Sequence, residues 1–327
     1  MHRIDVFNHF CPPKLWARIA PLLPKPAVER YEKGMRTMLD IELRRRLIGS
    51  FQDLQQVICL PQPGLDEMAP PDVTPELARL GNDEMADIVK KYPHEIPGFL
   101  ACLPMNNPDA AVKEVDRALK ELNACGIQLH SNVNGRPLDE PDFAPIFQRI
   151  AYHNKPIWIH PTRPPTHPDY MTEKMSKFDI WWGFGWQYET TAAMARLVFS
   201  GIFEKHPELK IICHHWGAYV PHGEGRLTPF WEGRDPELTK HLKKPLVQYF
   251  KMYYGDTAMF GAKAASQCGL DFFGADHSVF ATDAPYDREG GAVLIKLCTD
   301  VVSGLRCSDA DRDKIFSGNA KRILGLK

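Results

Sequence analysis

The chain has 327 residues, of which 44% are hydrophobic, so it is long enough to bury a large α/β core. Its 40 basic and 41 acidic residues give a formal net charge of −1 and are mixed along the sequence, which argues against nucleic acid or acidic lipid as a partner. No apolar run approaches the roughly 20 residues of a membrane span, no secretory leader pattern is present, and the eight cysteines form no CxxC pair. We therefore expect a cytoplasmic protein with buried, reduced thiols.

Eight short apolar stretches predict buried strands, and amphipathic helical patterns separate them. The clearest helical pattern covers residues 109–124. This alternation favours parallel βα units around one core, and we find no internal repeat and no linker in the sequence. We predict an α/β fold, a (β/α)8 TIM barrel, in a single domain over residues 1–327. The predicted strands are residues 4–7, 56–60, 98–103, 126–130, 156–160, 209–214, 251–255 and 278–282.

Two segments are too long for simple connections between a strand and a helix. They are residues 12–51, after the first predicted strand, and residues 162–187, after the fifth. Because both follow the carboxyl end of a strand, we expect both insertions to form lids and substrate walls at the mouth of the barrel.

Histidine and aspartate residues stand at the carboxyl ends of four predicted strands, and these ends open on one face of a barrel. Phe7 lies on the same side of the first strand as His9, where a second histidine would complete a chelate. Taken alone, each histidine also fits a hydrogen-bonded core residue. A carboxylate that ends a buried strand is rarely tolerated unless it is paired or bound to metal, so Asp283 is the strongest signal. The strand-end residues are His9, His160, His214, His215 and Asp283.

The two adjacent histidines after the sixth predicted strand should face opposite ways if the strand continues through them. One imidazole would then enter the mouth as a general acid or base, and the other would pack outside.

Further residues near the expected mouth are candidates for substrate binding. His130 and Asn132 follow the fourth strand, although Asn132 also fits a plain turn. Arg163 offers a bidentate donor for a carboxylate, or is a surface arginine. Trp182 is expected either to stack on an aromatic substrate or to belong to the core of its loop.

In this order the residues resemble the metal-dependent amidohydrolase superfamily. Within it, they resemble the branch of aminocarboxymuconate-semialdehyde decarboxylase, γ-resorcylate decarboxylase and related benzoate decarboxylases. The likeness covers nearly the whole chain. Its motifs include Trp158-Ile159-His160-Pro161, His215-Trp216-Gly217 followed by Pro221 and Arg226, Asp256-Thr257-Ala258, Thr282-Asp283-Ala284-Pro285-Tyr286 and Gly318-Asn319-Ala320.

The resemblance implies a (β/α)8 barrel with one divalent ion, most simply Zn²⁺, with Mn²⁺ as the alternative. His9, His160 and Asp283 would be ligands, Asp283 would also move a proton, and His215 would be a nearby acid–base group. Phe7 stands where the family has a histidine or glutamate ligand. The site would then hold its ion with three protein ligands, hold a different ion, or hold none. The resemblance also points to a homodimer.

The leading hypothesis is a carbon–carbon lyase, a metal-dependent non-oxidative decarboxylase of a small aromatic or dienoic carboxylic acid. The alternative is a metal-dependent hydrolase of an amide, lactone or ester, in which the same ligands activate water. A third reading, motivated by Phe7, is a non-catalytic barrel that binds a ligand through a degenerate metal site.

Overall fold

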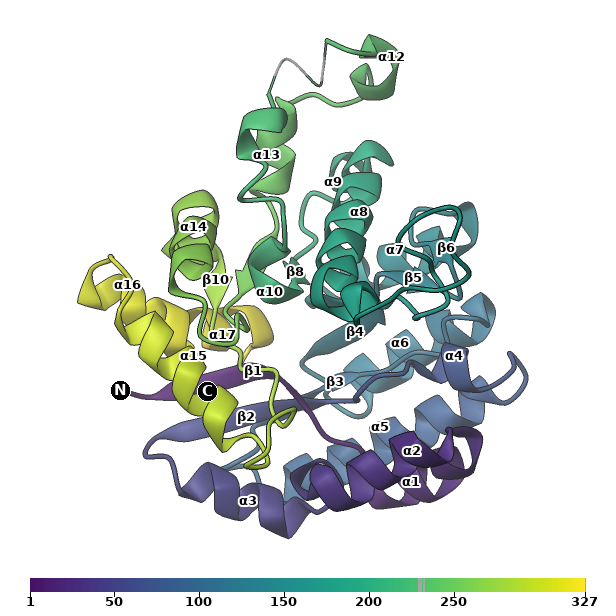
Figure 1. The fold of residues 1–327 in the computed structure, drawn as a ribbon, viewed down its shortest axis with the longest axis vertical. Helices are drawn as coiled ribbons and strands as arrows, with labels where there is room; N and C mark the ends of the chain where they lie inside the picture. Colours follow the sequence, from purple (N-terminus) through teal and green to yellow (C-terminus); the bar gives the residue numbers. More distant parts are fainter. Residues whose placement is uncertain (229–230, 232, 327) are drawn as a thin grey trace.

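The computed structural model describes residues 1–228, 231 and 233–326, and it confirms the predicted α/β barrel (Figure 1). Eight parallel strands pair in chain order, and helices surround them. The strands of the barrel are β1 (Arg3–His9), β2 (Leu54–Cys59), β3 (Gly98–Ala101), β4 (Gly126–His130), β7 (Ile157–His160), β8 (Ile211–Cys213), β9 (Tyr254–Asp256) and β10 (Ser278–Val279).

Hydrogen bonds between β1 and the segment after β10 close the sheet. The Asp283 amide donates to the Phe7 carbonyl oxygen at 3.1 Å. The buried Asp5 carboxylate ties the same two segments together, because it accepts a hydrogen bond from the Thr282 hydroxyl at 2.6 Å. Closure therefore places the end of β1, with His9, beside Asp283.

Alternate residues of the strands enter two separate buried clusters. In β7, Ile157 and Ile159 pack with the surrounding helices, whereas Trp158 belongs to the cluster inside the barrel. In β8, Ile212 is likewise inside the barrel. Because side chains alternate along a strand, the residue that follows each inward position by two also points inward, which directs His160 toward the barrel axis.

Helices fill most connections, including the long segment of residues 12–51, whereas residues 162–179 of the second long segment form turns and irregular chain before a π-helical turn at Trp181–Gly185. A third long connection, between β8 and β9, reaches farthest from the barrel at α12 (Figure 1). The helices are α1 (Pro13–Ile19), α2 (Lys25–Glu29), α3 (Ile41–Gly49), α4 (Leu65–Met68), α5 (Thr74–Lys91), α6 (Pro108–Lys120), α7 (Ala144–Tyr152), α8 (Trp186–Phe199), α9 (Ile202–Lys205), α10 (His214–Gly217), α12 (Pro236–Thr239), α13 (Leu246–Phe250), α14 (Lys263–Phe273), α15 (Ala292–Ser303), α16 (Asp309–Asp313) and α17 (Asn319–Leu324). A short hairpin, β5 (Asn132–Val133) and β6 (Arg136–Pro137), follows β4.

All eight predicted strands are present, but several boundaries differ. The seventh was placed too early, because α13 occupies residues up to Phe250 and β9 begins only at Tyr254. The predicted helix over residues 109–124 is α6, and Ala111, Val115 and Ala118 form its buried face.

All eight cysteines are free thiols, and six of them are buried; Cys268 and Cys307 are partly exposed. Within the described residues, no helix combines the length and apolar character that crossing a membrane requires.

Candidate metal centre at the barrel mouth

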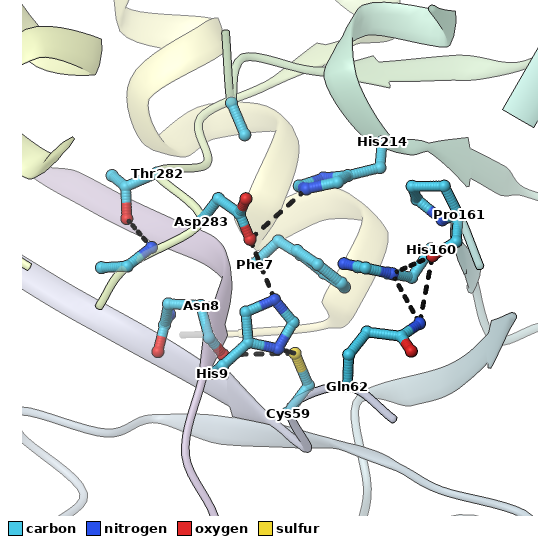
Figure 2. A network of polar contacts seen from close by, with 12 residues as sticks. Phe7, Asn8, His9, Cys59, Gln62, His160, Pro161, His214, Thr282 and Asp283 are labelled. Atoms are coloured by element: carbon cyan, nitrogen blue, oxygen red, sulfur yellow. Dashed lines mark hydrogen bonds and ion pairs between the residues drawn. The ribbon is translucent and has the colours of Figure 1, made fainter. Parts of the chain in front are cut away.

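The three predicted metal ligands lie together at the carboxyl ends of the strands (Figure 2). His9, His160 and Asp283 are at least 97% buried, and each offers a ligand atom within 4.8 Å of the other two. The closest contact joins His9 Nε2 to Asp283 Oδ1 at 2.9 Å. The structure thus brings this set together from β1, β7 and the segment after β10.

Carbonyl oxygens fix the orientation of two imidazoles. His9 Nδ1 lies 2.8 Å from the Leu60 carbonyl oxygen. His160 Nδ1 lies 2.6 Å from the Pro161 carbonyl oxygen, the shorter of its two contacts, since the Gln62 amide nitrogen is 3.0 Å away. An Nδ1 that faces a carbonyl oxygen carries a proton, so Nε2 is the nitrogen of each ring that a metal ion would bind. A buried Nε2 lone pair held in this way suits a metal ligand.

Phe7 occupies the middle of this cluster instead of a side chain that can bind metal. Its ring centroid lies 4.5 Å from that of His214, 5.0 Å from that of His9 and 5.7 Å from that of His160. The side chain is fully buried. The aromatic ring therefore packs against the histidines and supplies no ligand atom (Figure 2).

The expectation that His214 and His215 face opposite ways is wrong. β8 ends at Cys213, and the backbone then turns with positive φ at His215 and Trp216, so the strand alternation stops. His214 Nε2 lies 3.5 Å from Asp283 Oδ1, and His215 Nε2 lies 3.9 Å from Asp283 Oδ2. Both imidazoles approach the same carboxylate.

The indole of Trp216 is wedged between β9 and α14, and this packing holds the turn. A Cβ atom on Gly255 would lie 2.4 Å from Trp216 Cδ1, and one on Gly269 would lie 2.3 Å from Trp216 Cγ. The indole nitrogen donates to the Ser278 hydroxyl at 3.3 Å. Two glycines thus make the slot for the indole, which fixes the backbone that carries both histidines.

Sequence reasoning gave no role to His214 as such, nor to its partner. His214 Nδ1 bonds Asp256 Oδ2 at 2.6 Å, and both side chains are fully buried. The second oxygen of Asp256 accepts from the His215 backbone amide at 3.1 Å. A carboxylate at the end of β9, the strand next to β8, was the available signal for this pair.

Burial and neighbouring charges shift the pKa values of this cluster in opposite directions. Burial lowers the pKa of His214, but Asp256 and Asp283 outweigh it and raise that pKa to about 10. Burial opposes ionisation of Asp283, yet the charge of His214 and the hydrogen bond from His9 hold the pKa of its carboxyl well below the usual range. Burial, and then the charge on His214, lower the pKa values of His160 and His215. His160 and His215 are therefore neutral imidazoles beside an ionised carboxylate.

Two of the predicted substrate-binding residues lie around the cluster. His130 packs edge-on against His160, with ring centroids 5.8 Å apart, and lines a small cavity that Asp66 and Met105 also line. Trp182 is half exposed, and it is Trp186 that packs edge-on against His160, at 5.3 Å.

The other two predicted substrate-binding residues have protein partners. Arg163 pairs with Glu189 at 2.8 Å, with both side chains largely buried. The Asn132 amide is used within its turn, since Nδ2 donates to the Thr162 carbonyl oxygen at 3.0 Å and Oδ1 accepts from the Gly135 amide at 2.8 Å.

Comparison with known proteins supports the family resemblance along nearly the whole chain. The family model described as amidohydrolase matches residues 4–326. The γ-resorcylate decarboxylase of a Polaromonas species is 30% identical over 88% of this chain and 89% of its own length. The 2-amino-3-carboxymuconate-6-semialdehyde decarboxylase of Dictyostelium discoideum is 28% identical over 79% of this chain and 69% of its own.

Solved structures agree with this relationship. A dihydroxybenzoic acid decarboxylase from Polaromonas, with bound manganese and the inhibitor 2-nitroresorcinol, is 26% identical and superposes with a TM-score of 0.81, over 99% of this chain and 97% of its own. A 5-carboxyvanillate decarboxylase from Novosphingobium aromaticivorans, also with bound manganese, is 25% identical with a TM-score of 0.85 over the same shares. The chain therefore belongs to the amidohydrolase family, and the relatives and neighbours described here are its decarboxylases.

Proposed function

We propose that the protein is a metal-dependent, non-oxidative decarboxylase of a small aromatic or dienoic carboxylic acid. The observation that carries the proposal is the buried set of His9, His160 and Asp283, with ligand atoms within 4.8 Å of one another at the barrel mouth. Relatives named for decarboxylation of γ-resorcylate and 6-methylsalicylate, at 30% and 28% identity, support the substrate class.

The donors present fit one divalent ion, and we propose Zn²⁺ with Mn²⁺ as the alternative. Two imidazoles and a carboxylate are ligands that suit Zn²⁺. Manganese in two related structures supports Mn²⁺ as the alternative. When bound, the ion supplies positive charge that holds the substrate's carboxylate and a neighbouring oxygen. Elemental analysis of purified protein distinguishes the two ions.

Asp283 and His215 are the residues that we propose for proton transfer. His215 Nε2 lies 3.9 Å from Asp283 Oδ2, and neither ring nitrogen of His215 has a hydrogen-bond partner in the protein. The pair passes on a proton that it has first taken from water, and this proton forms the new C–H bond at the carbon that bears the carboxylate. The C–C bond to the carboxylate then breaks, its electron pair restores the conjugated system, and CO2 leaves.

We propose that His130, Arg163 and Trp182 bind the body of the substrate. His130 supports this through its place on the cavity beside His160. Arg163 is held by Glu189, so it is positioned before a substrate carboxylate arrives. Asn132 contributes by holding the turn that follows β4.

Decarboxylation of a panel of hydroxybenzoic acids in D2O tests the proposed reaction. The expected result is one CO2 released per acid consumed, with one deuterium on the ring carbon that carried the carboxylate. No turnover across the panel, together with ¹⁸O transfer from water into the product of an ester, lactone or amide, would show a hydrolase instead.

The packing of Trp216 predicts that a substitution outside the metal centre lowers the activity. Gly269→Ala places a methyl group 2.3 Å from Trp216 Cγ, so the turn must shift and activity should fall about 100-fold, with a loss of about 1–3 kcal/mol in stability. The matched control is Gly304→Ala, whose Cβ meets no atom closer than 3.4 Å. Steady-state kinetics and urea unfolding measure both effects. Equal activity of the two variants would contradict the proposed wedge.

We also propose a cytoplasmic homodimer. Eight free thiols support a reducing compartment. Exposed aromatic side chains on the segment between β7 and α9 and on the next connection support an interface, and they include Tyr170, Phe178, Trp182, Phe184 and Tyr219. Light scattering at micromolar concentration should give twice the chain mass, and cell fractionation tests the location.

A further inference from the structure

His214 is a buried imidazole whose position needs an explanation. Its side chain is fully buried, and its Nε2 has no hydrogen-bond partner in the protein. The nearest carboxylate atom, Asp283 Oδ1, is 3.5 Å away, which is too long for a good hydrogen bond. Burial of a polar atom without a partner is unfavourable, so a missing ligand is the natural explanation.

His214 is held in the same way as the two histidines already assigned to the ion. Each of the three rings has its Nδ1 on an oxygen: the Leu60 carbonyl for His9 at 2.8 Å and the Pro161 carbonyl for His160 at 2.6 Å. For His214 the oxygen is a carboxylate, Asp256 Oδ2, at 2.6 Å. A carboxylate behind a histidine is a common support for a metal ligand, since it fixes the tautomer and the direction of the ring.

His215 does not share this arrangement. Neither of its ring nitrogens has a hydrogen-bond partner in the protein, so nothing fixes its tautomer. Its ring lies against Phe260, with centroids 5.6 Å apart, as well as against His214. The two adjacent histidines therefore have different surroundings. An oxygen atom orients the ring of His214, whereas no hydrogen bond orients the ring of His215, which is free to exchange protons.

Phe7 and His214 lie side by side, and His214 offers the metal-binding atom that Phe7 lacks. The Phe7 ring stands where a ligand from β1 is expected, and its closest ring neighbour is His214, at 4.5 Å between centroids. The rings of His214 and His160 are stacked, with their centroids 5.2 Å apart (Figure 2). The last residue of β7 and the residue that follows β8 therefore lie next to each other at the metal centre. One donor position on β1 is lost, and one donor directly after β8 is available beside it.

We propose that His214 is a ligand of the divalent ion, replacing the ligand that Phe7 removes from β1, with Asp256 as its positioning residue. The inference rests on the proposed metal-dependent function and adds to it the composition of the ligand set. The ion would be held by three imidazoles and one carboxylate, from His9, His160, His214 and Asp283. His215 then remains outside the ligand set and keeps its part in proton transfer.

Charge favours this assignment as well as geometry. Asp256 and Asp283 flank the His214 ring on both sides, at 2.6 and 3.5 Å. Two buried carboxylates require positive charge between them, and a divalent ion beside Nε2 would supply it in place of the proton on His214.

Counting the imidazoles around the bound ion tests the proposal. The protein is loaded with one Zn²⁺ per chain and studied by zinc K-edge X-ray absorption. We expect three imidazoles in the wild type and in His215→Ala, and two in His214→Ala. Competition with a chromophoric chelator should show that His214→Ala weakens Zn²⁺ binding more than about 100-fold. His215→Ala, the matched control on the neighbouring residue, should change it less than about threefold.

The outcomes separate the role of His214 from the proposed function. Unchanged affinity in His214→Ala, or two imidazoles in the wild type, overturns the role of His214 and leaves an ion site of three ligands. A wild type that binds no Zn²⁺ or Mn²⁺ overturns both. If His214→Ala does not fold, the wild-type and His215→Ala counts decide: three imidazoles in both support the proposal, and two in either overturn it.

Discussion

Asp283→Asn should lower kcat for CO2 release by about 1,000-fold or more, because the side chain is proposed both to hold the ion and to move a proton. An amide has the same shape but carries no charge and accepts no proton at neutral pH. The backbone at Asp283 has a φ of +59°, and asparagine is among the few residues that adopt this conformation readily. The variant should therefore fold, and the loss should appear in steady-state kinetics with little change in the melting temperature of the metal-free protein.

Asp300→Asn is the matched control for this prediction. Asp300 lies on α15 and forms an exposed ion pair with Lys296, so its substitution should leave kcat unchanged. Residual activity of Asp283→Asn above a tenth of the wild-type value would remove Asp283 from the chemistry.

Removal of divalent ions by a chelator should abolish activity, and Zn²⁺ or Mn²⁺ should restore it. The physical reason is that His9, His160 and Asp283 are buried around one point, where the ion would supply the charge that holds the substrate's carboxylate. A ligand that binds only the folded state stabilises it, by about 3–4 kcal/mol at 100 to 1,000 times its Kd. Metal-free protein should thus melt several degrees lower, which scanning calorimetry measures.

The test of metal dependence needs metal content and activity on the same sample. Protein with fewer than one ion per ten chains and full activity would exclude a metal-dependent reaction. Recovery with Mg²⁺ alone would also contradict the ligand set, since imidazoles are poor ligands for this ion.

The fold and the triad were predictable because they depend on local patterns and on topology. Strands buried on both faces alternate with helices, and in a parallel barrel all carboxyl ends share one face. That rule alone brings His9, His160 and Asp283 together, although 274 residues separate the first from the last in sequence. Strand boundaries were less predictable, because the start of β9 depends on where α13 ends.

The orientation of His214 was not predictable from the pattern around it. Alternation predicts only that His214 and His215 face opposite ways, and it does not say which of them points inward. The observed turn depends on Trp216 and on two glycines from distant parts of the chain, Gly255 and Gly269. Similarly, the helical phase that presents Trp186 and not Trp182 to His160 depends on how the whole connection packs.

The wedge at Trp216 also sets the order in which the centre can assemble during folding. His215 and Trp216 have φ values of +55° and +50°, and left-handed backbone costs such residues roughly 1–2 kcal/mol each. In the isolated chain the turn is therefore rarely formed, because the slot between Gly255 and Gly269 exists only after β9 and α14 have docked. We therefore expect the histidines that follow β8 to reach Asp283 late, once the barrel is nearly closed. An ion that needs them is captured by a folded protein and does not nucleate its folding.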